Sequence, residues 1–281
     1  MDKTEQSILK DIRKEIFLTA VRGGIGHLAS AFSLVEILYT LYERKVLTYR
    51  PGEPQWEDRE RLILSKGHGS LALYVMLQRM GYFDVNYLHS FCQPGSTLGG
   101  EGNPISVPGV EAATGSLGMG IGYGLGIALA DKLNSNPKRT YVILGDGECQ
   151  EGAVWEAAIV AAAHRLDNLV AILDCNGVQK MDTTEKTMGK VAWEDKWSAF
   201  GWDVTQVEGH DVDQIETCLR SLENQGKPHL VLAHTVKGKG VSIMENSPSW
   251  HWRMPTRREL EIVLKDLCIT KEEYDKCSKH I

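Results

Sequence analysis

The sequence has no hydrophobic run long enough to cross a membrane. Its beginning also lacks the pattern of a signal peptide, because residues 1–7 are polar and lead into apolar residues at helical spacing. An excess of basic residues is missing too: the formal net charge of the 281 residues is −6, which disfavours a dominant basic face for nucleic acid. We therefore expect a cytoplasmic protein that binds neither membranes nor nucleic acid.

Cysteine patterns that bind zinc or build disulfide frameworks are missing as well. The six cysteines form no CxxC pair, and none combines with histidine at the spacing of a zinc site. The sequence also has no internal repeat and no low-complexity stretch. With 42% hydrophobic and 24% charged residues, its composition is that of a globular protein, so we expect buried or incidental thiols.

The second half of the sequence alternates short apolar segments with helical patterns. The apolar segments predict strands at residues 141–144, 169–173, 203–207 and 230–233. The patterns between them predict helices at residues 155–164, 193–200 and 212–222. Strands with few polar residues need cover on both faces, so this order predicts an α/β fold in which helices flank both faces of a parallel sheet.

The first part of the sequence is predicted to be mainly helical. Apolar residues at helical spacing predict one helix that includes residues 8–21 and another at residues 71–80. Ser33 and Glu36 have the spacing of a capping box, which predicts that a helix begins at Ser33. Residues 94–126 are dense in glycine and short of charge, which predicts loops packed closely around another group.

Polar residues directly follow two of the predicted strands, as Gly145-Asp146-Gly147 and Asp174-Cys175-Asn176. Ligands of open parallel sheets sit at the carboxyl ends of the strands. Oxygen atoms of Asp146 and Asn176 suit a hard divalent cation that is shared with phosphate oxygens. The helix expected to begin near Glu151 directs its N-terminus to the same place, which favours a diphosphate. Gly-Asp-Gly alone is a weak signal, but its combination with Asn176 one β-α-β unit later is strong.

This combination resembles the thiamine diphosphate motif that transketolases, pyruvate dehydrogenases and their relatives share. The resemblance implies the thiamine diphosphate-binding fold, also called the PP domain. It implies that Asp146, Asn176 and the backbone carbonyl of Val178 bind Mg²⁺ or Ca²⁺, and that the metal holds the diphosphate. It also implies that Gly147 contributes its backbone N–H to the cofactor.

Further blocks resemble transketolases in particular, in the same order along nearly the whole chain. They are Ser65-Lys66-Gly67-His68, Pro108-Gly109-Val110-Glu111, Thr114-Gly115-Ser116-Leu117-Gly118, Gly147-Glu148-Cys149-Gln150-Glu151-Gly152 and Lys237-Gly238-Lys239-Gly240, followed by Met244-Glu245-Asn246 and His251. So many ordered blocks outweigh the false-positive risk of any single motif. By this resemblance, residues 1–281 are expected to form one domain, the diphosphate-binding N-terminal part of a transketolase.

The resemblance also implies roles for residues outside the metal site. His27 and His251 are expected to contact the substrate and to take part in catalytic proton transfer, while His68 and His251 lie near the diphosphate. Imidazole suits both tasks because it exchanges protons near neutral pH. The resemblance also implies that Gly115 and Leu117 contact the rings of the cofactor. It implies that Glu151 and Asp174 form the shell around the cofactor and the contact with the other subunit.

The sequence departs from the family pattern near the substrate. Transketolases carry a Gly-His-Pro triplet whose histidine contacts the hydroxyl groups of the donor, and the nearest equivalent here is Gly102-Asn103-Pro104. We expect Asn103 to contact the substrate without proton transfer, because an amide does not titrate near pH 7. The usual glycines after His27 are replaced too, and Trp252 stands where a small residue is usual. These changes indicate an altered donor or acceptor, or else neutral drift or an alignment that misplaces Asn103.

A full transketolase is about twice as long as this chain, and its second domain supplies the carboxylate that activates the cofactor. The resemblance therefore implies a partner chain that carries the pyrimidine-binding and C-terminal domains, in a heterotetramer with two copies of each chain. Together the chains would use thiamine diphosphate to move a two-carbon ketol unit from a ketose phosphate to an aldose phosphate.

Two alternatives remain open. One is a related enzyme that acts on an unusual ketose or on a non-sugar acyl donor, which the residue at position 103 favours. The other is a subunit that binds the cofactor without catalysis, which the presence of His27, His68 and His251 disfavours. A deoxyxylulose-phosphate synthase and the α chain of a 2-oxo acid dehydrogenase match less well, because residues 150–152 and 237–246 resemble transketolase.

Overall fold

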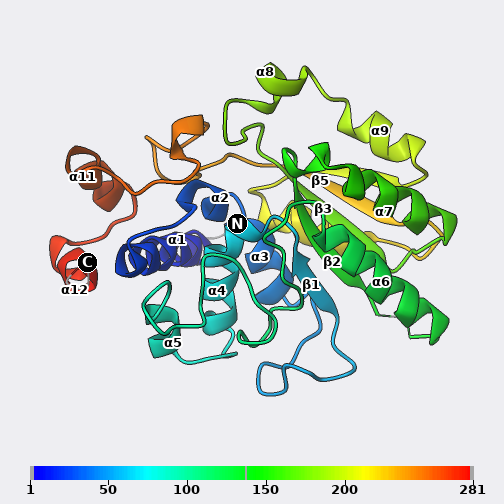
Figure 1. The fold of residues 1–281 in the computed structure, drawn as a ribbon, viewed down its shortest axis with the longest axis horizontal. Helices are drawn as coiled ribbons and strands as arrows, with labels where there is room; N and C mark the ends of the chain where they lie inside the picture. The colour runs from blue at the N-terminus through cyan, green and yellow to red at the C-terminus, as the bar shows by residue number, and fades with distance from the viewer. Residues whose placement is uncertain (1–2, 137, 279–281) are drawn as a thin grey trace.

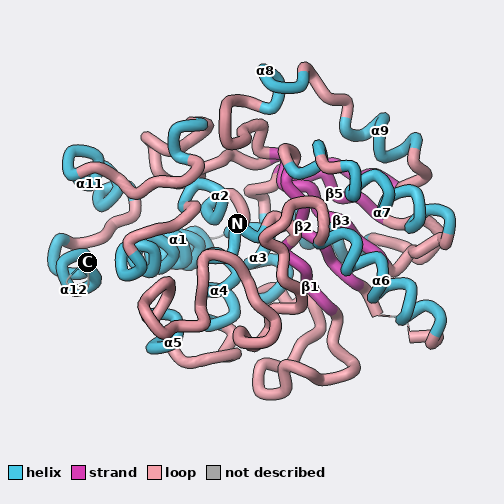
Figure 2. The backbone as a smooth tube through the Cα atoms, viewed as in Figure 1, coloured by secondary structure: helices cyan, strands magenta, loops and turns pink. Residues whose placement is uncertain are grey.

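A parallel five-stranded sheet forms the centre of the computed structural model, which describes residues 3–136 and 138–278 (Figure 1, Figure 2). The strands are β1 (Arg61–Leu64), β2 (Thr140–Gly145), β3 (Leu169–Cys175), β4 (Asp203–Glu208) and β5 (His229–His234), in the order β1-β2-β3-β5-β4. All neighbouring strands are parallel. The four predicted strands are thereby confirmed, and the sequence interpretation missed β1.

Helices cover both faces of this sheet, as predicted. One face packs against α6 (Gly120–Leu133), α7 (Gly152–Ala163) and α9 (Trp193–Ala199), through inward residues such as Val142 and Ala171. The opposite face, with Tyr141 and Val170, shares its core with α1 (Lys3–Gly23), α2 (Leu28–Phe32), α3 (Val35–Tyr42), α4 (Ser70–Arg79) and α10 (Val212–Ser221). Adjacent strand residues thus belong to different cores, because side chains alternate along a strand.

The remaining helical segments are short or peripheral. They are α5 (Val85–His89), α8 (Thr184–Met188), α11 (Arg257–Asp266), α12 (Lys271–Ser278) and the 3-10 helices η1 (Gly67–Gly69), η2 (Glu148–Gln150) and η3 (Pro248–Trp250). Figure 1 shows α11 and α12 at the opposite end of the molecule from α6 and α7. No helix within the described ranges is long and apolar enough to cross a membrane. All six cysteines are free, and Cys149, Cys218 and Cys277 are buried.

The predicted capping box at Ser33 is wrong. Ser33 ends α2, and α3 begins at Val35 without a side-chain cap. The hydroxyl of Ser33 donates instead to the Asp174 carboxylate at 2.8 Å, and Glu36 pairs with Arg13 at 2.7 Å. Both side chains are engaged by tertiary contacts, which compete with local capping.

The prediction of loops throughout residues 94–126 is correct only for the first part of this glycine-dense region. Residues 94–119 contain no helix or strand, but α6 begins at Gly120 and includes Gly122, Gly124 and Gly126. A Cβ atom on Gly124 would lie 2.3 Å from a methyl carbon of Val142, so glycine lets this helix approach the sheet closely. Close packing against the sheet therefore overrides the low helix propensity of glycine.

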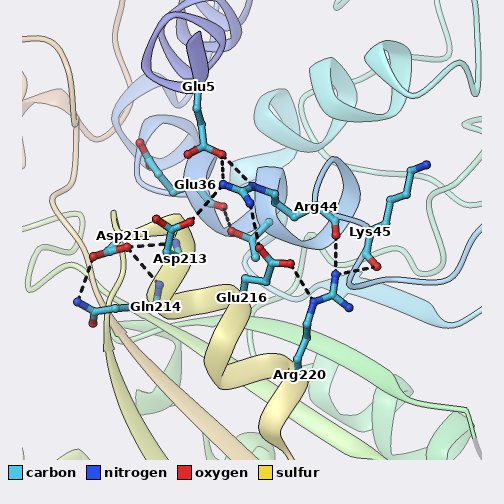
Figure 3. Close-up of polar contacts among 10 residues, drawn as sticks. Glu5, Glu36, Arg44, Lys45, Asp211, Asp213, Gln214, Glu216 and Arg220 are labelled. Carbon is cyan, nitrogen blue, oxygen red and sulfur yellow. Dashed lines mark hydrogen bonds and ion pairs between the residues drawn. The ribbon is translucent and has the colours of Figure 1, made fainter. Parts of the chain in front are cut away.

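A polar network ties α10 to the N-terminal helices (Figure 3). Arg44, which follows α3, contacts Glu5 of α1 at 2.7 Å and Glu216 of α10 at 3.2 Å. Arg220 of α10 donates to the Arg44 carbonyl at 2.7 Å and pairs with Glu216 at 2.9 Å. Because Arg44 and Arg220 are partly exposed, each such pair contributes about 0.2–1 kcal/mol, and the network mainly fixes how the helices join.

Candidate active site

The carboxyl ends of four strands and the loops after them meet at one edge of the sheet, where they line a cavity of about 380 Å³. We call it the cofactor cavity. Ten of the residues selected from the sequence line it: His27, His68, Gly115, Leu117, Asp146, Gly147, Glu151, Asn176, Val178 and His251. Asp174 and Asn103 are not among its lining residues. Residues distant in the sequence therefore come together where the strand-end rule predicted.

Asp146 occupies the turn after β2 and is almost completely buried. Its carboxylate accepts backbone hydrogen bonds from Gly147 at 2.8 Å and from Gly177 at 2.6 Å. Burial, followed by the nearby Asp174 carboxylate, nevertheless raises the pKa of Asp146 to about 6. A bound cation would reverse this shift, because it stabilises the ionised carboxylate.

Asp174 lies beneath the cavity and connects the segments around it. It is fully buried and forms an ion pair with Lys66, which follows β1. It also accepts hydrogen bonds from Ser33, Thr235 and Asn176. Burial opposes its ionisation, but the Lys66 ammonium outweighs this effect and holds the pKa of Asp174 below its usual value. Asp174 therefore positions the wall of the cavity without facing it.

Three histidines from distant segments form one cluster in the cavity. The ring centroids of His27 and His68 are 5.4 Å apart, those of His27 and His251 are 5.4 Å apart, and those of His68 and His251 are 5.5 Å apart. Burial, followed by Lys237, lowers the pKa of His27 to about 4 and that of His251 to about 3. Burial, followed by Lys66, also holds the pKa of His68 well below its usual value. All three are therefore neutral at pH 7.

Lys237 and Glu148 are two cavity residues to which the sequence analysis gave no role. The Lys237 ammonium donates to the Val178 carbonyl at 2.9 Å and lies 3.1 Å from Nδ1 of His251. Because an ammonium only donates, Nδ1 accepts and the proton of neutral His251 is on Nε2. Burial, followed by Lys66, lowers the pKa of Lys237 to about 8.

Glu148 holds three segments of the cavity together. It is buried and accepts hydrogen bonds from the Ser65 hydroxyl at 2.5 Å, from Gly118 N–H at 2.8 Å and from Gly145 N–H at 3.0 Å. Glu148 and Lys237 both belong to sequence segments that resemble transketolase, residues 147–152 and 237–240. The resemblance identified these segments, but it could not show which of their side chains face the cavity.

The loop around Asn103 differs from its expected arrangement. The side-chain oxygen of Asn103 accepts a hydrogen bond from the backbone N–H of Ile105 at 3.0 Å, so it closes a local turn. Asn103 is exposed and lines none of the cavities around the histidines, whereas Glu101 lines two of them. Glu101 was not selected from the sequence, because only the fold shows that it and not Asn103 faces the histidines.

The donors at the metal positions fit a hard cation. Asp146, Asn176 and Val178 offer a carboxylate, an amide oxygen and a backbone carbonyl, the oxygen ligands that Mg²⁺ and Ca²⁺ prefer. Within residues 3–136 and 138–278, no group of three or more His, Cys, Asp or Glu residues forms a metal site. The proposed ligands include only one carboxylate, that of Asp146, so they would not form such a group. One carboxylate with two neutral oxygen ligands suits a metal whose other ligands come from phosphate and water.

Comparison with known proteins gives the family. Residues 5–270 match the family model of the thiamine diphosphate-binding domain of transketolase. The chain is 38% identical to an apulose-4-phosphate transketolase subunit of Phocaeicola vulgatus, over 94% of each chain. It is 40% identical to the 6-deoxy-6-sulfo-D-fructose transketolase subunit SqwG of Clostridium sp., over 81% of this chain and 83% of that one.

Solved structures show the same relationship. The structure matches Campylobacter jejuni transketolase with a TM-score of 0.85 and 28% identity, covering 100% of this chain and 46% of that one. A transketolase mutant from Pichia stipitis gives a TM-score of 0.87 and 25% identity, covering 99% of this chain and 44% of that one. This chain thus spans less than half of these solved transketolases, but nearly all of the Phocaeicola vulgatus relative. It belongs to the transketolase family of transferases, in which it corresponds to the separate N-terminal subunit with the thiamine diphosphate-binding domain.

Proposed function

We propose that this chain is the diphosphate-binding subunit of a two-chain transketolase, which moves a two-carbon ketol unit from a ketose phosphate to an aldose phosphate. One observation carries the proposal. The cofactor cavity combines the oxygen donors Asp146 and Asn176 with the cluster of His27, His68 and His251, in a chain that belongs to this family. When bound, thiamine diphosphate supplies the covalent chemistry that breaks the C–C bond of the donor.

In this proposal Asp146, Asn176 and the Val178 carbonyl bind Mg²⁺ or Ca²⁺. The raised pKa of Asp146 supports a cation there, because burial and the Asp174 carboxylate oppose its ionisation and a bound cation would favour it. His68 and the N–H of Gly147 bind the diphosphate. Gly115 and Leu117 contact the rings of the cofactor, and Glu151 and Asp174 form the surrounding shell.

His27 and His251 are the proposed proton-transfer residues. Both side chains line the cofactor cavity and are neutral at pH 7. His27 can accept a proton at its unprotonated ring nitrogen, whereas His251, whose Nδ1 accepts from Lys237, can donate the proton on its Nε2. The diphosphate would raise the pKa of both imidazoles, because its negative charge offsets Lys66 and Lys237. Cofactor binding would therefore bring them closer to the working pH.

A partner subunit completes the proposed enzyme. We propose that residues 1–281 form a single domain and that the pyrimidine-binding and C-terminal domains lie on the partner, with two copies of each chain in the assembly. The word subunit in the names of two relatives supports a partner. Apolar side chains that are exposed on α6 and α7 and just before α6 also support it, because exposed apolar surface marks interaction sites: Leu117, Met119, Tyr123, Ile159 and Val160. The cytoplasmic location stays a prediction.

The second candidate is a split transketolase that acts on an unusual ketose. The names of the two relatives, which specify apulose 4-phosphate and 6-deoxy-6-sulfo-D-fructose, favour it. Glu101 also favours it, since this charged residue lines the cavity with the histidines and Asn103, the expected counterpart of the family's histidine, does not. The donor panel of the test must therefore include these sugars beside xylulose 5-phosphate.

The test is a ketol-transfer assay on the complex that copurifies with the tagged chain, with ribose 5-phosphate as one acceptor. We expect transfer that requires thiamine diphosphate and Mg²⁺, and that His27→Ala abolishes without loss of cofactor binding. Transfer from an unusual ketose alone would select the second candidate. Cofactor binding with no transfer from any donor would instead indicate a non-catalytic subunit.

A further inference from the structure

The chain directly after β5 reaches the cofactor cavity through Lys237, and we call residues 235–238 the lysine segment. The Lys237 side chain is buried, and its ammonium lies 3.1 Å from Nδ1 of His251. One residue later, the backbone N–H of Gly238 donates to the Ala29 carbonyl of α2 at 2.9 Å. The position of this segment therefore decides where the ammonium meets His251.

His210 binds the backbone of the lysine segment, although it does not line the cofactor cavity. Its Nε2 accepts a hydrogen bond from the Val236 N–H at 2.8 Å. A ring nitrogen that accepts from an N–H carries no proton, so His210 is neutral and its proton is on Nδ1. That nitrogen lies 2.9 Å from Oε2 of Glu36, so it donates to the carboxylate. One imidazole thus joins the residue before Lys237 to α3.

Glu36 is fixed in turn by a buried arginine. Arg13 of α1 and Glu36 form an ion pair at 2.7 Å, and their side chains are only 7% and 5% exposed. The same guanidinium donates to the Phe32 carbonyl at 3.2 Å. Burial opposes ionisation of Glu36, but Arg13 outweighs this effect and holds the pKa of Glu36 below its usual value. The ionised carboxylate accepts from Nδ1–H, which favours this tautomer of His210.

The backbone around His210 has little freedom. The N–H of Gly209 donates to the His234 carbonyl at 2.7 Å, and a Cβ atom on Gly209 would lie 2.4 Å from a methyl carbon of Thr235. Glycine therefore lets the turn after β4 approach the lysine segment closely. On the other side of His210, the Asp211 carboxylate caps α10 by accepting from two backbone N–H groups. The imidazole between these contacts is 9% exposed.

We propose that His210 is a positioning residue: it holds the lysine segment so that Lys237 meets Nδ1 of His251, and this contact fixes the proton of His251 on Nε2. The importance of that proton for catalysis rests on the proposed function. His210 acts through Lys237 and not on the substrate. Such a residue affects the rate because a small displacement of a group at the reacting atoms weakens its part in the reaction.

The first measurement locates the protons of both histidines in the unchanged full chain. Histidine is labelled with an NMR-active nitrogen isotope, and long-range proton–nitrogen correlation spectra show which ring nitrogen carries the proton. The spectra of His210→Gln and His251→Gln identify the two sets of signals. We expect a single tautomer for each at pH 7.5, with the proton on Nδ1 of His210 and on Nε2 of His251. A proton on Nε2 of His210 would overturn the proposal.

His210→Leu and His210→Gln then separate the hydrogen bonds from the volume of the side chain. Leucine makes neither bond, so we expect His251 to lose its single tautomer and kcat of ketol transfer by the complex to fall at least about tenfold. Glutamine has an amide oxygen that can accept from Val236 and an amide N–H that can donate to Glu36. It should restore the Nε2–H tautomer of His251 and most of the lost kcat.

His234→Leu is the matched control, because it removes an imidazole from the end of β5, directly before the lysine segment. His234 is exposed, and its Nε2 lies 2.8 Å from Oε1 of Gln206. This substitution should change neither the tautomer of His251 nor kcat. An unchanged tautomer of His251 in His210→Leu, or its loss in His210→Gln, would overturn the proposal. The unchanged chain and His210→Gln decide the question even where His210→Leu does not fold.

Tautomers are measured on this chain and ketol transfer on the complex, so the two proposals can fail separately. The predicted tautomers in a complex that transfers no ketol unit would keep the role of His210 and refute the proposed function. A fall of kcat in His210→Leu without a change in the tautomer of His251 would refute only the route through Lys237.

Discussion

The Asp146 carboxylate is the residue on which the proposed metal site depends most. It is buried beside a second carboxylate, Asp174, whose own cation is Lys66. Burial and Asp174 raise its pKa to about 6, so a proton competes with a metal for this group. Metal affinity at such a site falls as the pH decreases through the pKa of the ligand, because the ligand must be deprotonated.

Asp146→Asn tests this dependence. We expect it to weaken Mg²⁺-dependent binding of thiamine diphosphate at pH 7.5 by at least about 100-fold, since loss of a ligand costs more than loss of an outer-shell partner. The affinity of the unchanged protein should fall between pH 7 and pH 5. Titration calorimetry measures both effects. The control is Asp182→Asn, in the loop between β3 and α8. Equal affinity in Asp146→Asn would exclude this carboxylate as a ligand.

The histidine cluster predicts how stability depends on pH. The pKa values of His27, His68 and His251 are all lower in the folded chain than the ordinary value of 6.5. Below pH 6.5 the unfolded chain therefore binds protons that the folded chain does not bind, and the free energy of unfolding falls as the pH falls. Asp146 opposes this trend between about pH 6 and 4, because its folded pKa is raised.

Burial also raises the pKa of Glu148, so two carboxylates oppose the three histidines. The three histidines outweigh them, and we expect the chain without cofactor to be less stable at pH 5 than at pH 7.5. His68→Gln should make this difference smaller, because it removes one of the three groups. Urea denaturation at both pH values measures it, with exposed His164→Gln as the control. If His68→Gln left the pH dependence unchanged, burial of this imidazole would not be a source of it.

Part of the site could be predicted from residue types and spacing. Asp146 and Asn176 were recognisable because each follows a buried strand, and both line the cofactor cavity. Asp174 and Glu148 act through contacts with segments distant in the sequence, which no local pattern encodes. Asn103 and Glu101 are only two residues apart, and which of them faces the histidines depends on the path of one loop.

At the scale of elements, buried strands were predictable and a glycine-rich helix packed against the sheet was not. β2 and β3 are buried along nearly their whole length, and continuous apolar segments signalled them. β1 is only four residues long and lies outside the region of regular alternation, so it left a weaker pattern. The start of α6 was missed because glycine normally indicates loops, whereas here it allows close packing.

Two glycines of α6 test this explanation with the same substitution. Gly124→Ala would force a Cβ atom against Val142, and we expect a loss of about 1–3 kcal/mol of unfolding free energy from overpacking. Gly126→Ala meets no atom within 4 Å and should gain about 0.5–1 kcal/mol, because alanine favours the helix. Urea denaturation measures both changes. Equal effects of the two substitutions would contradict the packing role of Gly124.

At the scale of the whole molecule, the apolar surface of α6 and α7 is the feature that points to assembly. Figure 1 shows these helices side by side on the outside of the sheet. Ile159 of α7 is 53% exposed, and Glu151 stands at the start of the same helix beside the cofactor cavity. A partner seated on α6 and α7 would cover this apolar surface and lie close to Glu151, which lines the cavity.

Ile159→Asp should therefore weaken assembly at least about tenfold, because a charge would be buried at the interface. The stability of the isolated chain should stay within about 0.5 kcal/mol, since the side chain is exposed before assembly. Light scattering on the purified complex measures the change. Ile262→Asp on α11, where the side chain is 39% exposed, is the control. Unchanged assembly of Ile159→Asp would place the interface elsewhere.

The central claim is that this chain holds one half of a cofactor site that a partner completes. The most direct measurement is a titration of the copurifying partner into the chain, with Mg²⁺ and thiamine diphosphate present, in which retained cofactor and ketol transfer are followed together. We predict that both rise in parallel and level off at one partner per chain, with no transfer by either chain alone. Full cofactor retention and full transfer by this chain without the partner would contradict the account.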